Sequence, residues 1–215
     1  WSSDVCSSDL MSTALWMSEK LAEGVEHPVH VQDCAAAFAW LVKHAATYRL
    51  DPKRMFVGGF SSGAHLSALL ATDPRYLKAH ALEPSAVRGA LPVGGAYDME
   101  AYYKIHLEHN GKQMADQHVL DVFGHADGRL ADASPTTHMR KTEGPTLSLS
   151  VADTDGYTKV IEDAVAKAGI KRIRFRHVPD RRHRTMGKLM AREQADDARE
   201  AMVGFIEKPE PTPPP

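Results

Sequence analysis

Residues 56–66 read FVGGFSSGAHL, and within them Gly59, Ser61 and Gly63 form the pattern G-x-S-x-G. An apolar run precedes the pattern, and leucines at helical spacing follow it. A strand, a very tight turn and a helix in this order are what a nucleophile elbow requires. The turn forces the serine into a strained conformation, and small residues two positions to either side let strand and helix pass close together. The stretch therefore predicts that the Ser61 hydroxyl is exposed at the N-terminal end of a helix.

The residue after this serine has a predicted role of its own. A helix leaves its first N–H groups without an intrahelical acceptor, so the backbone N–H of Ser62 is free to donate to a developing oxyanion. Ser62 cannot itself be the elbow serine, because Phe60 would then occupy a position that needs glycine.

Length and composition limit the class of protein. The chain has 215 residues, a formal charge of −2 and two cysteines, Cys6 and Cys34. This length corresponds to one domain with enough chain for a large core. The sequence has no block of Lys and Arg and no apolar run near the ~20 residues of a membrane span, so it indicates neither a nucleic-acid partner nor a membrane span. Two cysteines do not make a disulfide framework, and the histidines lack metal-ligand spacing, so we predict no metal and no cofactor.

Apolar periodicity divides the chain into alternating strands and helices. The predicted strands are 54–58, 86–94, 145–152 and 171–178, and the predicted helices are 29–47, 62–72, 157–168 and 190–207. This alternation implies an α/β fold with a parallel sheet and helices on both faces, in which chemistry gathers at the C-terminal ends of the strands. The last strand alternates arginine with other side chains, which predicts a strand at the sheet edge.

A serine hydroxyl needs a general base, and the base needs an orienting carboxylate. In the elbow architecture the chain order is Ser, then Asp or Glu, then His, and two histidines follow the strand 145–152. His177 lies within the last strand and is interpreted as a packed or edge histidine. His183 lies in the loop PDRRHRT just past that strand and is the predicted base.

The carboxylate is expected in the loop after residues 145–152. Asp155, nearer the following helix, is the predicted acid, and Asp153 is the alternative. The other of the two is expected to cap a helix or stabilise a turn. Asp98 is a further candidate for the acid, although it is more simply interpreted as a turn residue and helix N-cap. His65, which precedes the acid in chain order, is predicted to be structural.

The two ends of the chain are set apart from the fold. Residues 1–10, WSSDVCSSDL, back-translate to a common sequencing-library adapter, and we interpret them as non-native. Residues 11–207 are interpreted as a truncated domain whose N-terminal strands are missing, with 97–143 as an insertion that shapes a pocket. Residues 208–215 are rich in proline and are predicted to be disordered.

These features give the chain a resemblance to the α/β-hydrolase superfamily, in particular to its hormone-sensitive-lipase-like, feruloyl-esterase-like and kynurenine-formamidase-like esterases and lipases. The matching stretches are HPVHVQDCAAAFAWLVKHA, RLDPKRMFVGGFSSGAHLSALLA, DASP at 132–135, the strand and Asp loop at 145–155, and VPDRRH at 178–183. The resemblance covers about residues 16–207 and implies that Ser61, Asp155 and His183 form a triad that hydrolyses small-molecule carboxylic esters.

The chain departs from this family pattern in three places. An H-G-G-type oxyanion loop has no counterpart, the acid loop reads VADTDGY instead of H-G-x-x-D, and the histidine loop reads DRRH. Loss of one oxyanion donor can cost on the order of 10²–10³ in rate, so the chain as given is expected to be essentially inactive, and an unpaired sheet edge should make it poorly soluble. Amide or formamide hydrolysis, and a non-catalytic binding protein on the same scaffold, stay open as alternatives.

Overall fold

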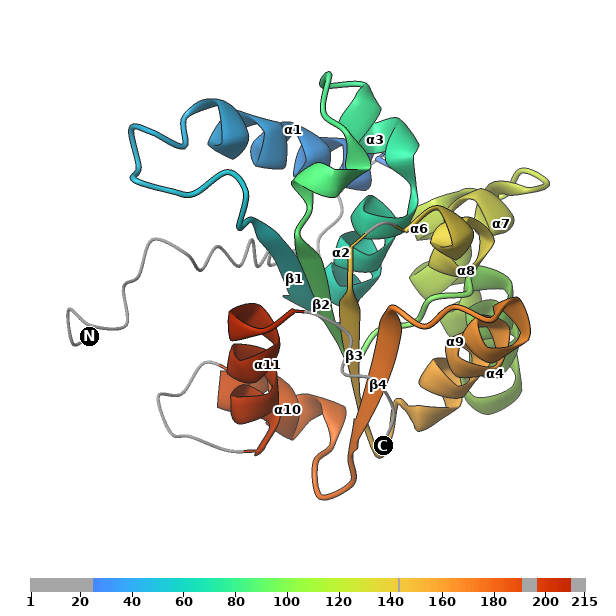
Figure 1. Cartoon of the computed structure of the whole chain (residues 1–215). Coiled ribbons are helices and arrows are strands. Elements are labelled where there is room, and N and C mark those ends of the chain that lie inside the picture. The colour runs from blue at the N-terminus through green and yellow to red at the C-terminus, as the bar shows by residue number, and fades with distance from the viewer. Residues whose placement is uncertain (1–24, 143, 191–196, 210–215) are drawn as a thin grey trace.

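The computed structural model describes residues 25–142, 144–190 and 197–209, and its centre is a parallel sheet in the order β1-β2-β3-β4 (Figure 1). The four strands are β1 (Phe56–Phe60), β2 (Gly89–Val93), β3 (Thr146–Val151) and β4 (Ile173–Val178). Each neighbouring pair is parallel, which confirms the predicted α/β class. The strand β4 lies at one end of the order, as its alternating sequence predicts.

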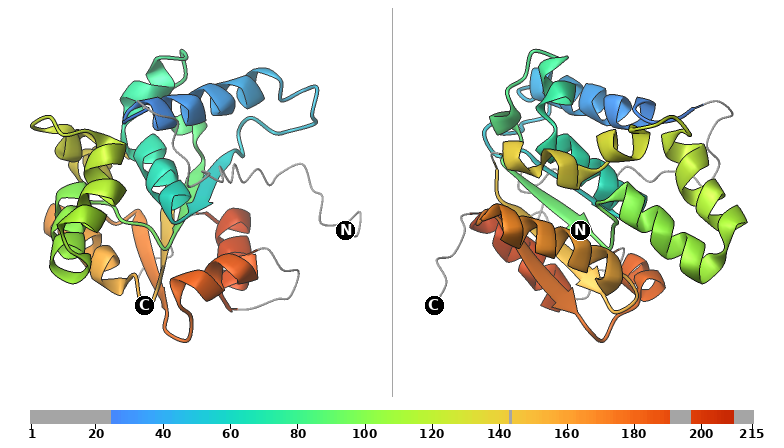
Figure 2. Two further views of the ribbon diagram at one scale, coloured as in Figure 1. Left: turned by 180° about the vertical axis from the view of Figure 1, so that it is seen from behind. Right: turned by 90° about the vertical axis from the view of Figure 1, so that its right-hand side faces the viewer.

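Helices cover both faces of this sheet, as predicted (Figure 1). The longer helices are α1 (Val29–Lys43), α2 (Ser62–Thr72), α4 (Met99–Asn110), α9 (Asp155–Ala168), α10 (His183–Met190) and α11 (Asp197–Glu207). Shorter turns are α3 (Pro74–Lys78), η1 (Pro84–Ala86), α5 (Lys112–Ala115), η2 (Asp116–Leu120), α6 (Asp121–Phe123), α7 (Arg129–Asp132), α8 (Pro135–His138) and η3 (Met139–Lys141). Figure 2 shows α1, α2 and α3 side by side, in agreement with their contacts.

The strand β3 shows how the sequence builds two faces. All six of its residues are buried, and successive side chains point to opposite sides of the sheet. Leu147, Leu149 and Val151 pack in one apolar cluster with Met186 of α10 and Phe205 of α11. The alternate residues are buried but polar: Thr146, Ser148 and Ser150. They lie on the face that α9 covers, where each needs a hydrogen-bond partner.

A second apolar cluster holds the glycine-serine turn in place. Val31 and Phe38 of α1 pack with Leu66 and Leu69 of α2 and with Val57 of β1. These residues have low exposure, at most 7%. The helix that follows Ser61 is therefore fixed against the sheet along its length.

Several predicted boundaries agree with the structure and others shift. The helix α2 matches its predicted range of 62–72 residue for residue. The strand β2 forms inside the sheet despite Pro92, and α1 ends four residues before its predicted end. The predicted last helix, 190–207, is wrong at its start, because α10 already begins at His183 and α11 begins at Asp197, after residues 191–196, which lie outside the described part.

The segment between β2 and β3 is a set of short helices beside the sheet. Asp98 accepts a hydrogen bond from the N–H of Ala101 at 3.0 Å and is the N-cap of α4, as expected. These helices lie in the segment 97–143, which is expected from sequence to shape a pocket. Among the described residues, no helix is long and apolar enough to cross a membrane. Residues 1–10 and 210–215 lie outside the described part of the chain.

Candidate active site

Ser61 occupies a strained turn between β1 and α2. Its backbone has φ 58° and ψ −118°, a conformation that L-residues seldom adopt. The Ser61 N–H donates to the carbonyl of Val93 at 2.9 Å, so the neighbouring strand β2 holds the turn. Such strain costs of order 1–3 kcal/mol and persists only where the surrounding structure over-determines it.

Two glycines make the approach of strand and helix possible. A Cβ atom on Gly59 would lie 2.3 Å from the carbonyl oxygen of Gly63 and 2.8 Å from its Cα. A Cβ atom on Gly95 would lie 2.7 Å from the Cβ of Ala64 in the first turn of α2. Glycine at position 59 of the G-x-S-x-G pattern is therefore a steric requirement of this turn.

A cavity of about 780 Å³ opens beside the turn. Its walls include Ser61 and Ser62, Asp153 from the β3–α9 connection, and His183 from the start of α10. Ser62 is the first residue of α2, so its N–H has no acceptor within the helix. Ser61, Ser62, Asp153 and His183 thus line one space, whereas the other two candidates from sequence, Asp155 and Asp98, do not line it.

His183 is the first residue of a helix, which corrects the prediction that it lies in a loop. Its ring packs on that of Phe60, the residue before Ser61, with 4.4 Å between ring centroids and 33° between planes. Burial lowers the pKa of His183, and the charge of Asp153 opposes that shift. In the described part of the chain no hydrogen bond joins the Ser61 hydroxyl to the His183 ring, as is frequent in enzymes without substrate.

Asp153 and Asp155 have different partners. Asp153 accepts a hydrogen bond from the backbone N–H of His183, with 2.6 Å from nitrogen to Oδ1. Asp155 accepts one from the hydroxyl of Ser150 at 2.7 Å and contacts Nδ1 of His177 at 3.0 Å. The sequence favours Asp155 as the partner of His183, but in the structure Asp155 contacts His177, and Asp153 is the one that bonds His183. Asp155 begins α9 and faces β4, whereas Asp153 precedes the helix and faces α10.

His177 is an edge histidine, as interpreted from sequence, and both of its ring nitrogens have hydrogen-bond partners. Its Nδ1 lies 2.6 Å from the Ser150 hydroxyl, and its Nε2 lies 2.7 Å from Glu162 of α9. Hydrogen bonding to Asp155 and to Glu162 raises the pKa of His177, with burial opposing the shift. This group of Ser150, Asp155, Glu162 and His177 is called the edge cluster below.

His65, predicted to be structural, also borders the cavity. It is buried, and its Nε2 donates to the carbonyl of Ala133 at 2.7 Å. Burial lowers its pKa to about 4, so the ring is neutral. Among the described residues, no three His, Cys, Asp or Glu side chains are grouped as metal ligands.

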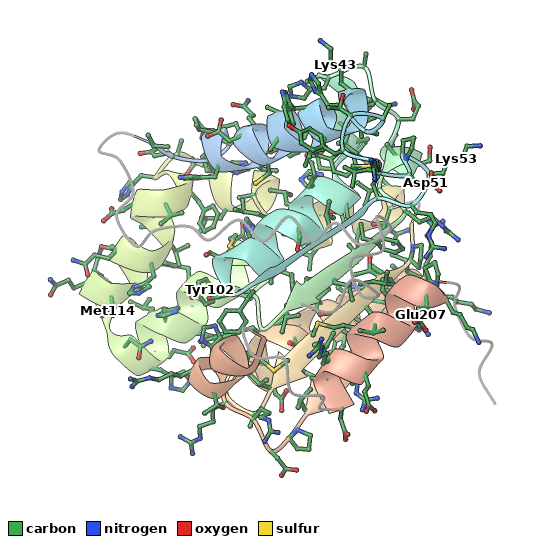
Figure 3. The ribbon with its side chains drawn as sticks, turned by 90° about the vertical axis from the view of Figure 1, so that its left-hand side faces the viewer. Lys43, Asp51, Lys53, Tyr102, Met114 and Glu207 are labelled. Atoms are coloured by element: carbon green, nitrogen blue, oxygen red, sulfur yellow. The ribbon has the colours of Figure 1, made fainter. Side chains whose placement is uncertain are left out.

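Much of the remaining cavity lining, called the far wall below, comes from residues 97–143, which the sequence predicts to shape a pocket without indicating any residue for it. It contains aromatic and histidine side chains: Tyr102, His106, His118, Phe123 and Tyr157. Figure 3 shows Tyr102 between the ends of α2 and α10. The four-residue spacing of Tyr102 and His106 puts them on one helix face. That spacing is a usable signal, but only the fold shows that the face turns toward Ser61.

The whole chain can now be compared with known proteins. The BD-FAE family model matches residues 15–159. Esterase LipQ of Mycobacterium tuberculosis is 27% identical over 170 residues, which are 73% of this chain and 38% of LipQ. The probable carboxylic ester hydrolase LipM of the same organism is 36% identical over 74 residues, 33% of this chain and 17% of LipM. The chain thus spans less than half the length of these relatives.

Solved structures agree on the fold. A truncated carbohydrate esterase from gut microbiota has a TM-score of 0.65 at 20% identity, covering 86% of this chain and 70% of that one. An esterase of Pyrobaculum calidifontis has a TM-score of 0.65 at 15% identity, covering 90% and 65%. At these identities the likeness shows the fold alone, and the family model supplies the relationship. The chain belongs to the BD-FAE family, an α/β-hydrolase family of esterase and lipase type.

Proposed function

We propose that this protein hydrolyses carboxylic esters through an acyl-enzyme on Ser61. The observation that carries the proposal is the strained Ser61 turn, which borders a large cavity together with His183 and Asp153. A serine held at φ 58° at the start of a helix has no evident structural use, and it presents its hydroxyl where an acyl group fits.

The residues have separate roles in this reaction. The Ser61 hydroxyl attacks the acyl carbonyl carbon while neutral His183 takes its proton. The N–H of Ser62, at the positive end of α2, donates to the oxygen that gains negative charge. His183 then returns the proton to the leaving alcohol. Water, activated in the same way, releases the carboxylic acid and restores Ser61.

The orienting carboxylate is the finer part of the proposal. We assign it to Asp153, whose carboxylate already binds the backbone of His183 and whose charge favours protonated His183. Asp155, the first choice from sequence, instead bonds Ser150 and His177 through its Oδ1.

The names of the relatives support an ester as substrate. LipQ is named an esterase and LipM a probable carboxylic ester hydrolase, and both match this chain over part of their length. We carry that activity over as a proposal. An amide or formamide substrate would use the same residues, because the chemistry at the acyl carbon is the same.

Covalent labelling tests the nucleophile directly. A fluorophosphonate should modify the purified protein at Ser61, identified by mass spectrometry of the tryptic peptide, and Ser61→Ala should abolish labelling. The matched control is Ser150→Ala, which should label like the unmodified chain. Failure of Ser61 to react in the folded protein would refute the proposal and favour a binding protein on a hydrolase scaffold.

A further inference from the structure

The far wall of the cavity carries two stacked histidines that the proposed reaction does not use. His106 of α4 and His118 of η2 both line the cavity, with 5.3 Å between ring centroids and 10° between planes. We propose that this pair is a subsite for a neutral hydroxyl group of the substrate, with one ring donating a hydrogen bond to it and the other accepting one. The inference rests on the proposed function only in placing this hydroxyl on the ester that Ser61 attacks.

The second nitrogen of each ring fixes its tautomer. Nδ1 of His118 lies 2.9 Å from the carbonyl oxygen of Met114, which can only accept, so Nδ1 carries a proton and Nε2 of the neutral ring is an acceptor. Nδ1 of His106 lies 2.8 Å from the amide nitrogen of Asn110, which can only donate, so the proton of His106 is on Nε2. In the described part of the chain neither Nε2 has a partner. The pair therefore offers one donor and one acceptor side by side.

The local backbone indicates that this wall is built and not incidental. The turn η2 that carries His118 is a π-helix of five residues, and such turns are rare and frequent at functional sites. Asp116, its first residue, accepts from the hydroxyl of Tyr103 at 2.8 Å and pairs with Lys112. The ring of Tyr102 packs edge-on against His106, with centroids 4.5 Å apart. These contacts hold both rings in place before any ligand binds.

Charge favours a neutral partner over an ionised one. Burial and the neighbouring His118 lower the pKa of His106, so this ring is neutral near pH 7. Burial raises the pKa of Tyr102 to about 12, and it also raises that of Tyr157. Among the described lining residues there is no Lys or Arg to bind a carboxylate, and Asp153 at the Ser61 end is the one carboxylate. A hydroxyl can donate to His118 and accept from His106 with a single oxygen.

Paired esters test this subsite. The substrates are the butanoate monoesters of ethanediol, propanediol and butanediol, each compared with the alkyl butanoate in which a methyl group replaces the hydroxyl. At one chain length the hydroxyl ester should have a kcat/KM about 3- to 10-fold above that of its methyl counterpart, because only the hydroxyl can hydrogen-bond to both rings. His118→Asn, which lacks an acceptor at the Nε2 position, should bring this ratio to about 1. His118→Gln should restore most of it, because its amide oxygen reaches the Nε2 position. His109→Asn, an exposed histidine of α4 outside the cavity wall, should keep the ratio.

A binding measurement separates this proposal from the ester-hydrolase proposal. NMR titration of the Ser61→Ala protein with the same ester pairs needs no turnover, so it reports on the subsite even if no ester is hydrolysed. Tighter binding of the hydroxyl ester, lost in Ser61→Ala/His118→Asn, supports the subsite whatever the reaction. Equal binding and equal kcat/KM within every pair would overturn it, as would a hydroxyl preference that survives His118→Asn unchanged.

Discussion

Two groups of serine, histidine and aspartate lie in the described part of this chain, and we propose a catalytic role for only one of them. The edge cluster joins Ser150, His177 and Asp155 at 2.6–3.0 Å, with Glu162 on the far side of the imidazole. The cavity group of Ser61, His183 and Asp153 is far less tightly bonded. By interatomic distance alone, the edge cluster would be the better triad.

The difference lies in exposure, backbone and proton direction. Ser150 is fully buried in a regular strand, and its hydroxyl donates to Asp155 while it accepts from His177. Both nitrogens of His177 face carboxylates, so the ring donates twice and cannot take a proton from a serine. Ser61 lies in a strained turn on a cavity, beside a histidine whose pKa burial lowers. The proposal for Ser61 therefore rests on an open hydroxyl and a neutral base more than on short distances.

Removing each serine hydroxyl gives the largest contrast. Ser61→Ala should abolish whatever turnover of a short p-nitrophenyl ester the protein has, because no nucleophile remains. Ser150→Ala should leave kcat/KM within about 10-fold and lower the free energy of unfolding by about 1–3 kcal/mol, since Asp155 and His177 lose a buried partner. The measurements are steady-state kinetics and urea unfolding. Equal activity losses in the two variants would show that the comparison is wrong.

The two aspartates should differ next. Asp153→Asn should lower kcat by ~10²–10⁴, because the imidazolium that forms on His183 loses its counter-charge. The acid limb of kcat/KM should also move to lower pH, since the Asp153 charge raises the pKa of His183. Asp155→Asn should change kcat by less than about 10-fold. The reverse order of effects would return the acid role to Asp155.

Two glycines distinguish the strained turn from the ordinary one. Gly59→Ala should destabilise the protein by about 3 kcal/mol or more, because its Cβ would lie 2.3 Å from a backbone oxygen. Gly156→Ala, beside Asp155 in the first turn of α9, meets no atom within 4 Å and should stabilise the helix by about 0.5–1 kcal/mol. Thermal unfolding followed by circular dichroism checks both. A Gly59→Ala protein as stable as the parent would contradict the close packing described above.

The smallest expected effect is a pH dependence of the edge cluster. The pKa of His177 is raised above its ordinary value of 6.5 by Asp155 and Glu162. The stability it adds is fully present below pH 6.5 and is lost as the pH rises through its folded pKa. The exposed fraction of its side chain is 45%, so solvent screening should keep the effect below about 1 kcal/mol. The urea midpoint of the parent should therefore exceed that of His177→Gln at pH 6, and this difference should shrink at pH 9. A difference of the same size at both pH values would argue against a titrating His177.

Much of the fold could be predicted from the sequence, because it depends on local patterns. Apolar periodicity predicted both ends of α2 correctly and placed most strand ends within two or three residues, since a buried face must repeat with the period of its element. The end of α1 and the start of α10 were missed. In the second case the PDRRHRT stretch reads as a loop, although Thr185, the third residue of α10, accepts from the N–H of Arg182 just before the helix.

The sequence by itself determined the Ser61 turn, because a side chain at Gly59 would clash with the backbone of Gly63, which lies only four residues further along the chain. Only the tertiary structure decided which carboxylate faces which histidine. Asp153 and Asp155 are two residues apart, and their partners come from α10 and β4, which the chain reaches some 20 to 30 residues later. The directions of the Asp153 and Asp155 side chains depend on where the β3–α9 connection ends and α9 begins, and on the packing of α10 and β4 beside them. The tertiary structure also decided that the stacked histidines His106 and His118 line the cavity, because only the fold brings α4 and η2 to the same cavity as Ser61.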